Sequence, residues 1–171
     1  NDVLHETKEF TNVREVAEWA GEEYGDKIAY SFRLDGQRGD ITKITFTKFR
    51  DDVRALTSQL ISMGCAGSHC VLVGKCSYEW ILIYYSVLSA GGVLVPLDRD
   101  WQAEDLADTA AKADAAFLFC DEDIKEKAEV ISAKASLVSE PYYVLAKESE
   151  NSVASLIEAG KVYIAETPLY E

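Results

Sequence analysis

The sequence contains no apolar run long enough to cross a membrane. Its longest, from Trp80 to Ala90, falls well short of the roughly 20 apolar residues that a membrane-spanning helix needs. The amino terminus, Asn1 to His5, has neither the basic region nor the apolar stretch of a secretory signal. We therefore expect no membrane span and no secretory leader.

Positive charge is also scarce. The chain has 17 Lys and Arg residues against 30 Asp and Glu residues, which gives a formal net charge of −13. A nucleic acid or an anionic membrane would have to approach against this field. The composition therefore argues against both as partners and is typical of a solubilising acidic surface.

The cysteines and histidines do not show the spacing of a metal site. No two cysteines form a CxxC pair, and His5 and His69 lie far apart in the sequence. The four cysteines are Cys65, Cys70, Cys76 and Cys120. We interpret them as reduced thiols in a cytoplasmic protein, and we predict no metal site.

Two common nucleotide-binding motifs are missing as well. A dinucleotide fingerprint needs three spaced glycines, but the loop before Tyr78 offers only Gly74. There is no GxxxxGK[ST] phosphate loop, and Gly91-Gly92 follows a predicted helix, where glycine is typical of a left-handed cap. Dinucleotide binding and P-loop chemistry are therefore not expected.

What the sequence does contain is one α/β domain or a piece of one, since 171 residues with 48% hydrophobic content can bury a core. Apolar spacing predicts a first helix over Asn12–Tyr24, capped by Thr11 or Asn12. Strands Ile28–Leu34 and Ile41–Thr47 are predicted to form a hairpin. Thr47 is expected to cap a second helix that ends at Gly64.

Strands and helices then alternate. The predicted elements are strand Cys70–Gly74, helix Tyr78–Ala90, strand Val93–Leu97, helix Ala103–Lys112, strand Ala115–Cys120 and helix Ile124–Ala133. Alternating βα units and apolar strands indicate a parallel sheet flanked by helices. A weaker strand over Tyr142–Leu145 and a helix over Ser152–Ala159, ending at Gly160, are expected next, with Lys161–Glu171 as a lead-out.

Ligands of open parallel sheets bind at the carboxyl ends of the strands. The segments there are 75–77, 98–100 and 121–123, and none contains a recognisable catalytic set. Ser77 precedes a helix with Glu79 in its first turn, which is typical of a cap. The acid pairs in the other two segments are interpreted as solvated charges, with cation binding or acid–base work as the alternative.

Several short segments, in order, resemble the amino-terminal region of the adenylate-forming superfamily, which includes AMP-forming acyl-CoA synthetases. They are ITFTKF at residues 44–49 (like "YTYAEL"), 56–64 (like "LAxxLxxxG"), KCSYEW at 75–80 (like "xNSPEW") and VLSAGGVLVPLD at 87–98 (like "AVLKAGAVYVPLDP"). The resemblance runs from about Phe10 to Asp123. The sequence departs from the pattern at Cys76, Tyr78 and Arg99, where the family usually has Asn, Pro and Pro.

The resemblance implies that residues 1–171 are a truncated amino-terminal subdomain of a carboxylic acid:CoA ligase of fatty acid metabolism, inactive by itself. The family's phosphate-binding loop, nucleotide motifs and mobile carboxy-terminal lid would come from elsewhere in the polypeptide, which would be this segment's partner. ATP, Mg²⁺ and coenzyme A would serve the full-length protein, and the fragment would bind none of them alone. Arg99, Lys125 and Lys127 match the place where CoA-using relatives hold the CoA nucleotide, so the resemblance implies phosphate contacts there, with surface charge as the alternative.

Two other interpretations stay open. In the first, the chain is a stand-alone binding or oligomerisation module that kept the scaffold of the family and lost its chemistry. A homo-oligomer is compatible with the sequence. A flavodoxin-like or receiver-like domain would account for the βα units, but it would not account for the initial helix and hairpin. The thiol that displaces AMP in the second step is also left open, since it would be either coenzyme A or a carrier-protein thiol.

Overall fold

The computed structural model describes residues 8–33, 39–145 and 149–166, without the side chains of 165 and 166. Within these ranges the chain forms an α/β body with a parallel sheet and a separate antiparallel hairpin, as the sequence predicts. The strands of the parallel sheet are β3 (His69–Val73), β4 (Val93–Leu97), β5 (Ala115–Cys120) and β6 (Tyr142–Tyr143). Their spatial order is β4-β3-β5-β6. The predicted strand over Tyr142–Leu145 is thus shortened to two residues.

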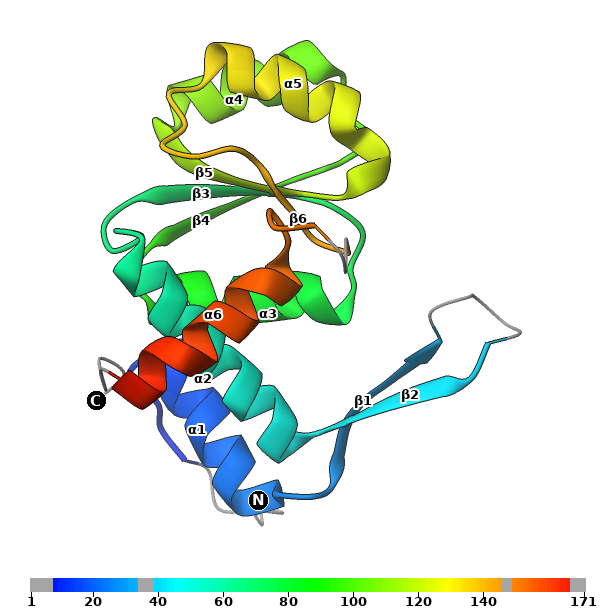
Figure 1. The fold of residues 1–171 in the computed structure, drawn as a ribbon, viewed down its shortest axis with the longest axis vertical. Coiled ribbons are helices and arrows are strands. Elements are labelled where there is room, and N and C mark those ends of the chain that lie inside the picture. The colour runs from blue at the N-terminus through cyan, green and yellow to red at the C-terminus, as the bar shows by residue number, and fades with distance from the viewer. Residues whose placement is uncertain (1–7, 34–38, 146–148, 167–171) are drawn as a thin grey trace, which may run out of the picture.

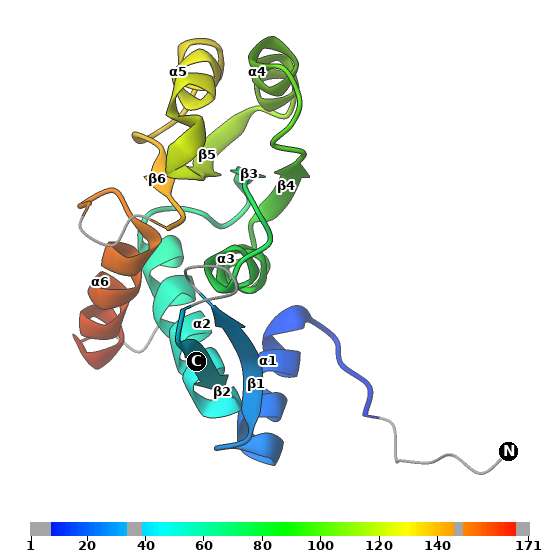
Figure 2. The ribbon, with the colours of Figure 1, turned by 90° about the vertical axis from the view of Figure 1, so that its right-hand side faces the viewer.

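Helices cover both faces of this sheet, as Figures 1 and 2 show. On one face lie α4 (Ala103–Lys112) and α5 (Lys125–Lys134). On the other lie α2 (Phe46–Ser62), α3 (Tyr78–Ser89) and α6 (Val153–Glu166), with α1 (Val13–Tyr24) packed beyond α2. The predicted helix over Ile124–Ala133 begins with a short 3₁₀ turn, η1 (Glu122–Ile124). None of the described helices is long and apolar enough to span a bilayer.

The side chains of β5 contribute to two separate hydrophobic cores, one on each face of the sheet, because successive side chains in a strand point to opposite faces. Phe117 and Phe119 are buried with α2 and α3, whereas Leu118 and Cys120 are buried with α4 and α5. Neighbouring β3 divides in the same way. This two-sided burial explains why the strands read as continuous apolar runs in the sequence.

The hairpin joins β1 (Ile28–Arg33) and β2 (Ile41–Thr45) and stands apart from the parallel sheet (Figure 1). Tyr30 and Phe32 point toward the body, where Phe32 stacks on Tyr78 with ring centroids 6.0 Å apart. Leu34, the last residue of the predicted first strand, lies outside the described residues, as do residues 35–38 between the two predicted strands.

Two predicted helix boundaries are wrong. The cap of α2 is Thr45 and not Thr47: its backbone is extended and its hydroxyl accepts a hydrogen bond from the Lys48 amide at 3.1 Å. Both threonines satisfy the cap pattern, and the hairpin pairing decides between them, since it ends at Thr45. Asn12 and Ser77 are caps as predicted, accepting from the amides of Glu15 and Trp80.

The helix predicted to stop at Gly160 continues through it to Glu166. Gly160 is buried where α6 crosses α2, and a Cβ at this position would lie 1.9 Å from the carbonyl oxygen of Ala55. The glycine therefore permits close helix packing and does not end the helix. The predicted lead-out is helical from Lys161 to Glu166, and residues 167–171 lie outside the described ranges.

Candidate functional site

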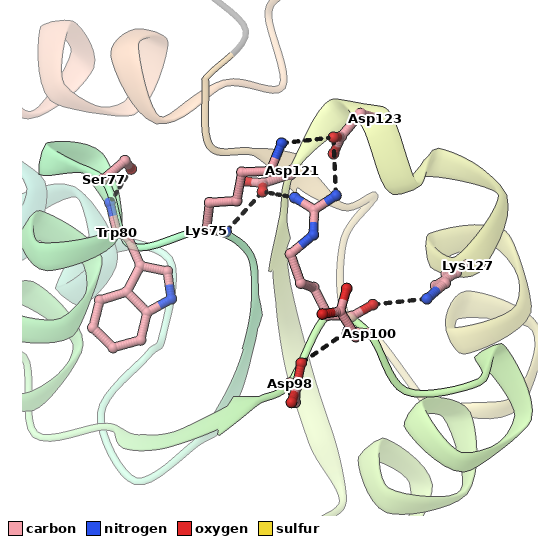
Figure 3. Close-up of polar contacts among 9 residues, drawn as sticks. Lys75, Ser77, Trp80, Asp98, Asp100, Asp121, Asp123 and Lys127 are labelled. Atoms are coloured by element: carbon pink, nitrogen blue, oxygen red, sulfur yellow. Dashed lines mark hydrogen bonds and ion pairs between the residues drawn. The ribbon is translucent and has the colours of Figure 1, made fainter. Parts of the chain in front are cut away.

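The carboxyl ends of β3, β4 and β5 bring together charged residues that are far apart in the sequence (Figure 3). The Arg99 guanidinium lies between two carboxylates: its Nη1 is 2.5 Å from Asp121 Oδ2 and its Nη2 is 2.9 Å from Asp123 Oδ2. Lys75 joins both acids, since its amide donates to Asp121 Oδ2 at 2.8 Å and its Nζ lies 3.2 Å from Asp123 Oδ2. We call these four residues the carboxyl-edge network.

Asp121 is the buried member of this network. Its side chain is 4% exposed, and within the described part of the chain its Oδ1 has no hydrogen-bond partner. A Cβ on Gly74 would lie 2.7 Å from this oxygen. Only a residue without a side chain lets the carboxylate approach the end of β3 so closely, so Gly74 is required for this packing.

The network holds the exposed Asp123 in its charged form. Hydrogen bonding from Arg99 lowers the pKa of Asp123 below its usual value, with a smaller contribution from Lys75. In turn Asp123 raises the pKa of Arg99. The guanidinium is therefore committed to this chain's own acids.

We expect Arg99→Ala to raise the pKa of Asp123 toward its unfolded value of about 3.9. A carboxyl whose pKa is lowered by folding stabilises the fold above the unfolded pKa, and this contribution is lost as pH falls through the folded pKa. The variant should therefore lose less stability on acidification below about pH 4. A carboxyl-carbon NMR titration of Asp123 measures the midpoint directly.

Lys134→Ala is the matched control, because Lys134 pairs with Asp108 on the outer helices and does not contact the network. It should leave the Asp123 midpoint unchanged. An unchanged midpoint in Arg99→Ala would mean that the guanidinium does not bind Asp123 in solution.

The other two residues predicted to contact CoA lie at α5. The Nζ of Lys127 donates to the carbonyl oxygen of Arg99 at 2.7 Å (Figure 3). It also donates to the carbonyl oxygen of Trp101 at 2.7 Å and so fixes the loop after β4. Lys125 is exposed at the start of the helix. An incoming phosphate would have to compete with Asp121 and Asp123 for Arg99, so the site as it stands fits this group poorly. The CoA contact at Arg99, Lys125 and Lys127 stays a prediction.

The acid pairs at this edge have structural partners. Asp98 Oδ1 accepts from the Asp100 amide at 2.9 Å, which closes a local turn, and Asp121 and Asp123 share Arg99. Among the described residues, no three His, Cys, Asp or Glu side chains gather as metal ligands would.

Sequence reasoning missed a second polar cluster, which consists of Lys48, Asp52 and Tyr78. Asp52 is buried in α2, where its Oδ2 accepts from the Tyr78 hydroxyl at 2.8 Å and its two oxygens lie 2.6 and 2.5 Å from Lys48 Nζ. Burial first, and then the Asp52 charge, raise the pKa of Tyr78 above its usual value. The i, i+4 spacing of Lys48 and Asp52 could have indicated the ion pair. The contact with Tyr78 has no local signal in the sequence.

The fold and this edge are those of an open parallel α/β domain in which the charged residues of the carboxyl-edge network are paired with one another. A family model described as "AMP-binding enzyme" matches residues 17–167, and the chain therefore belongs to this family. The match confirms the resemblance to the amino-terminal portion of adenylate-forming enzymes.

Known relatives agree in sequence and in fold. The long-chain-fatty-acid–CoA ligase FadD15 of Mycobacterium bovis is 29% identical over 99 residues, which is 57% of this chain and 16% of that protein. The crystal structure of a long-chain-fatty-acid–CoA ligase (FadD1) from Archaeoglobus fulgidus superposes with a TM-score of 0.78 at 15% identity, covering 91% of this chain and 31% of that one. The A domain of a carboxylic acid reductase from Segniliparus rugosus gives 0.73 at 16% identity over 94% and 28%. The chain thus spans well under half the length of the proteins it matches.

Proposed function

We propose that this chain is the amino-terminal part of an ATP-dependent, AMP-forming carboxylic acid:CoA ligase. The observation that carries the proposal is the family match over residues 17–167. The relatives matched in sequence are named as CoA ligases, for long-chain fatty acids in FadD15 and for medium-chain acyl groups in a mitochondrial relative from Macaca fascicularis. The complete protein would join a carboxylic acid to AMP with release of pyrophosphate, and a thiol, coenzyme A, would then displace AMP. ATP, Mg²⁺ and CoA belong to that complete protein, for which we also propose a cytoplasmic location and a role in fatty acid metabolism.

We further propose that residues 1–171 are a scaffold with no turnover of their own. Adenylation requires groups that position the ATP phosphates and stabilise the charge of the transition state. At the carboxyl edge, Arg99 and Lys75 are paired with Asp121 and Asp123, and Lys127 binds backbone carbonyls. These cations stiffen the loops that would border a ligand site, and they are not poised to bind three phosphates.

Pyrophosphate exchange tests the proposal. The complete protein encoded by the same reading frame should exchange labelled pyrophosphate into ATP only when a suitable acid from a panel of short-, medium- and long-chain carboxylic acids is present. The 171-residue chain should show no exchange above the acid-free background. Exchange by the short chain would contradict the proposal that residues 1–171 have no turnover of their own. If the complete protein showed no exchange with any acid, the proposed ligase activity would be wrong.

A further inference from the structure

Two buried cysteines lie in contact at the junction between α2 and β3. The sulfurs of Cys65 and Cys70 are 3.5 Å apart, within hydrogen-bond distance for two thiols, and both residues are 0% exposed. Both are free cysteines in this structure. Neither the carboxyl-edge network nor the cluster around Asp52 involves them.

The turn between α2 and β3 brings these two thiols together. Gly64 and Gly67 have φ angles of 83° and 74°, which glycine adopts readily, and they let the chain reverse between the helix and the strand. The Ser68 amide donates to the Cys65 carbonyl oxygen at 2.9 Å and closes the turn. Cys70 follows in β3, which is held in place by pairing with both β4 and β5. The contact between the thiols is therefore built into the path of the backbone.

The backbone after α3 packs against the other side of the Cys65 sulfur. A Cβ at Gly92 would lie 2.8 Å from that sulfur. The Val93 amide donates to the Ser68 carbonyl oxygen at 2.8 Å, which ties the same backbone to the turn. The Cys65 sulfur thus lies between Gly92 and the Cys70 sulfur.

The two thiols of the pair differ in reactivity from the other buried cysteine. Burial raises the pKa of Cys120 to about 12, and among the described residues Cys120 has no thiol partner. In the pair, the hydrogen bond from Cys70 lowers the pKa of Cys65, whereas that hydrogen bond and burial raise the pKa of Cys70. Because the thiolate is the form that attacks an oxidant, Cys65 is the member of the pair that reacts first.

The pair lies close beneath the surface. Gly64, Ala66 and Gly67, on either side of Cys65 in the turn, are exposed. A disulfide bond is about 2.05 Å long, so the two sulfurs would have to approach each other by about 1.5 Å. A small shift of an exposed turn provides that approach, and it also opens a short path for an oxidant of nearly the size of water.

We propose that Cys65 and Cys70 form a reversible oxidation site, which a small hydroperoxide such as hydrogen peroxide converts into a disulfide. The Cys65 thiolate attacks one peroxide oxygen, so that an S–O bond forms, the O–O bond breaks and hydroxide leaves. The Cys70 sulfur then attacks the sulfenic acid at Cys65, so that the S–S bond forms, the S–O bond breaks and a second hydroxide leaves. The two thiol protons convert both hydroxides to water. Two thiols and one peroxide therefore give one disulfide and two waters, and the site is independent of the proposed ligase activity.

Tryptic peptide mapping tests the site, because cleavage after Arg54 and Lys75 yields a peptide, 55–75, that contains Cys65 and Cys70 and no other cysteine. The folded chain is treated with hydrogen peroxide, unfolded with an alkylating agent present, and digested. We expect this peptide to lose two hydrogen atoms and to escape alkylation, and dithiothreitol should restore both thiols. Oxidation of Met63 in the same peptide adds an oxygen atom and is distinguished by its mass.

Two serine variants separate the roles of the buried thiols. Cys70→Ser removes the second thiol, so the crosslink should be lost and the sulfenic acid at Cys65 should be captured by dimedone, a reagent for sulfenic acids. Cys120→Ser is the matched control, because Cys120 is equally buried and is not part of the pair. This variant should form the crosslink at the rate of the wild type.

Three results would contradict the proposal. The first is a peptide 55–75 that stays fully alkylated under conditions in which the exposed Cys76 is oxidised. The second is a crosslink that forms only in urea, because it would then belong to the unfolded chain. The third is a Cys70→Ser variant in which Cys65 captures no dimedone, because Cys65 would then not be the thiol that attacks the peroxide.

Discussion

Gly160→Ala should lower the free energy of unfolding by about 3 kcal/mol or more, because it forces a methyl group into the backbone of another helix. A Cβ at residue 160 of α6 would lie 1.9 Å from the carbonyl oxygen of Ala55 in α2. Neither helix can yield by rotating a side chain, so the two must move apart. Helix propensity alone predicts the opposite sign, since alanine inside a helix is favoured over glycine by about 1 kcal/mol.

Urea denaturation followed by circular dichroism measures this change. Ala159→Ser is the matched control: it also adds one heavy atom, at the residue before Gly160, which is exposed on the same helix, and it should cost about 0.5 kcal/mol or less. A Gly160→Ala variant as stable as the wild type would mean that α6 does not pack against α2 at Ala55.

Tyr78→Phe should cost about 1.5–3 kcal/mol, the usual loss for a hydrogen bond to a charged group. The Tyr78 hydroxyl donates to the buried Asp52 carboxylate at 2.8 Å, and the substitution leaves that oxygen with Lys48 alone. Desolvation is the reason for the large effect, since Asp52 is only 3% exposed and water cannot replace the lost donor.

Tyr84→Phe is the control for Tyr78→Phe, because Tyr84 lies on the same helix and is 37% exposed. It should change the free energy of unfolding by less than about 0.5 kcal/mol. A double-mutant cycle with Asp52→Asn isolates the pairwise contribution. A Tyr78→Phe cost that is unchanged in the Asp52→Asn background would show that ring packing, and not the hydrogen bond, causes the loss.

Local patterns predicted most of the elements in the described ranges. Strands β4 and β5 and helix α4 have the predicted bounds, and the parallel sheet follows from the alternation of strands and helices. The boundaries that were wrong, at Thr45 and Gly160, are positions where one residue type serves two purposes. Threonine suits both a strand and a cap, and glycine suits both a helix end and a close helix crossing.

The candidate site was predictable as a place but not as a network. The sequence put Asp98–Asp100 and Asp121–Asp123 at the carboxyl edge because every βα loop of a parallel sheet ends there. It could not show that Arg99 binds acids 22 and 24 residues further along the chain. That pairing depends on β3 lying between β4 and β5, and this order is not encoded in any single strand.

The sequence by itself determined the type and order of the elements, the apolar strands and the family pattern, because each depends on residues close together along the chain. Only the tertiary structure decided that Gly160 faces Ala55, that Tyr78 binds Asp52, and that Arg99 is committed to Asp121 and Asp123. The physical reason is range: hydrophobic periodicity acts over a few residues, whereas close packing and desolvated charge pairs join residues that only the folded chain brings within 3 Å.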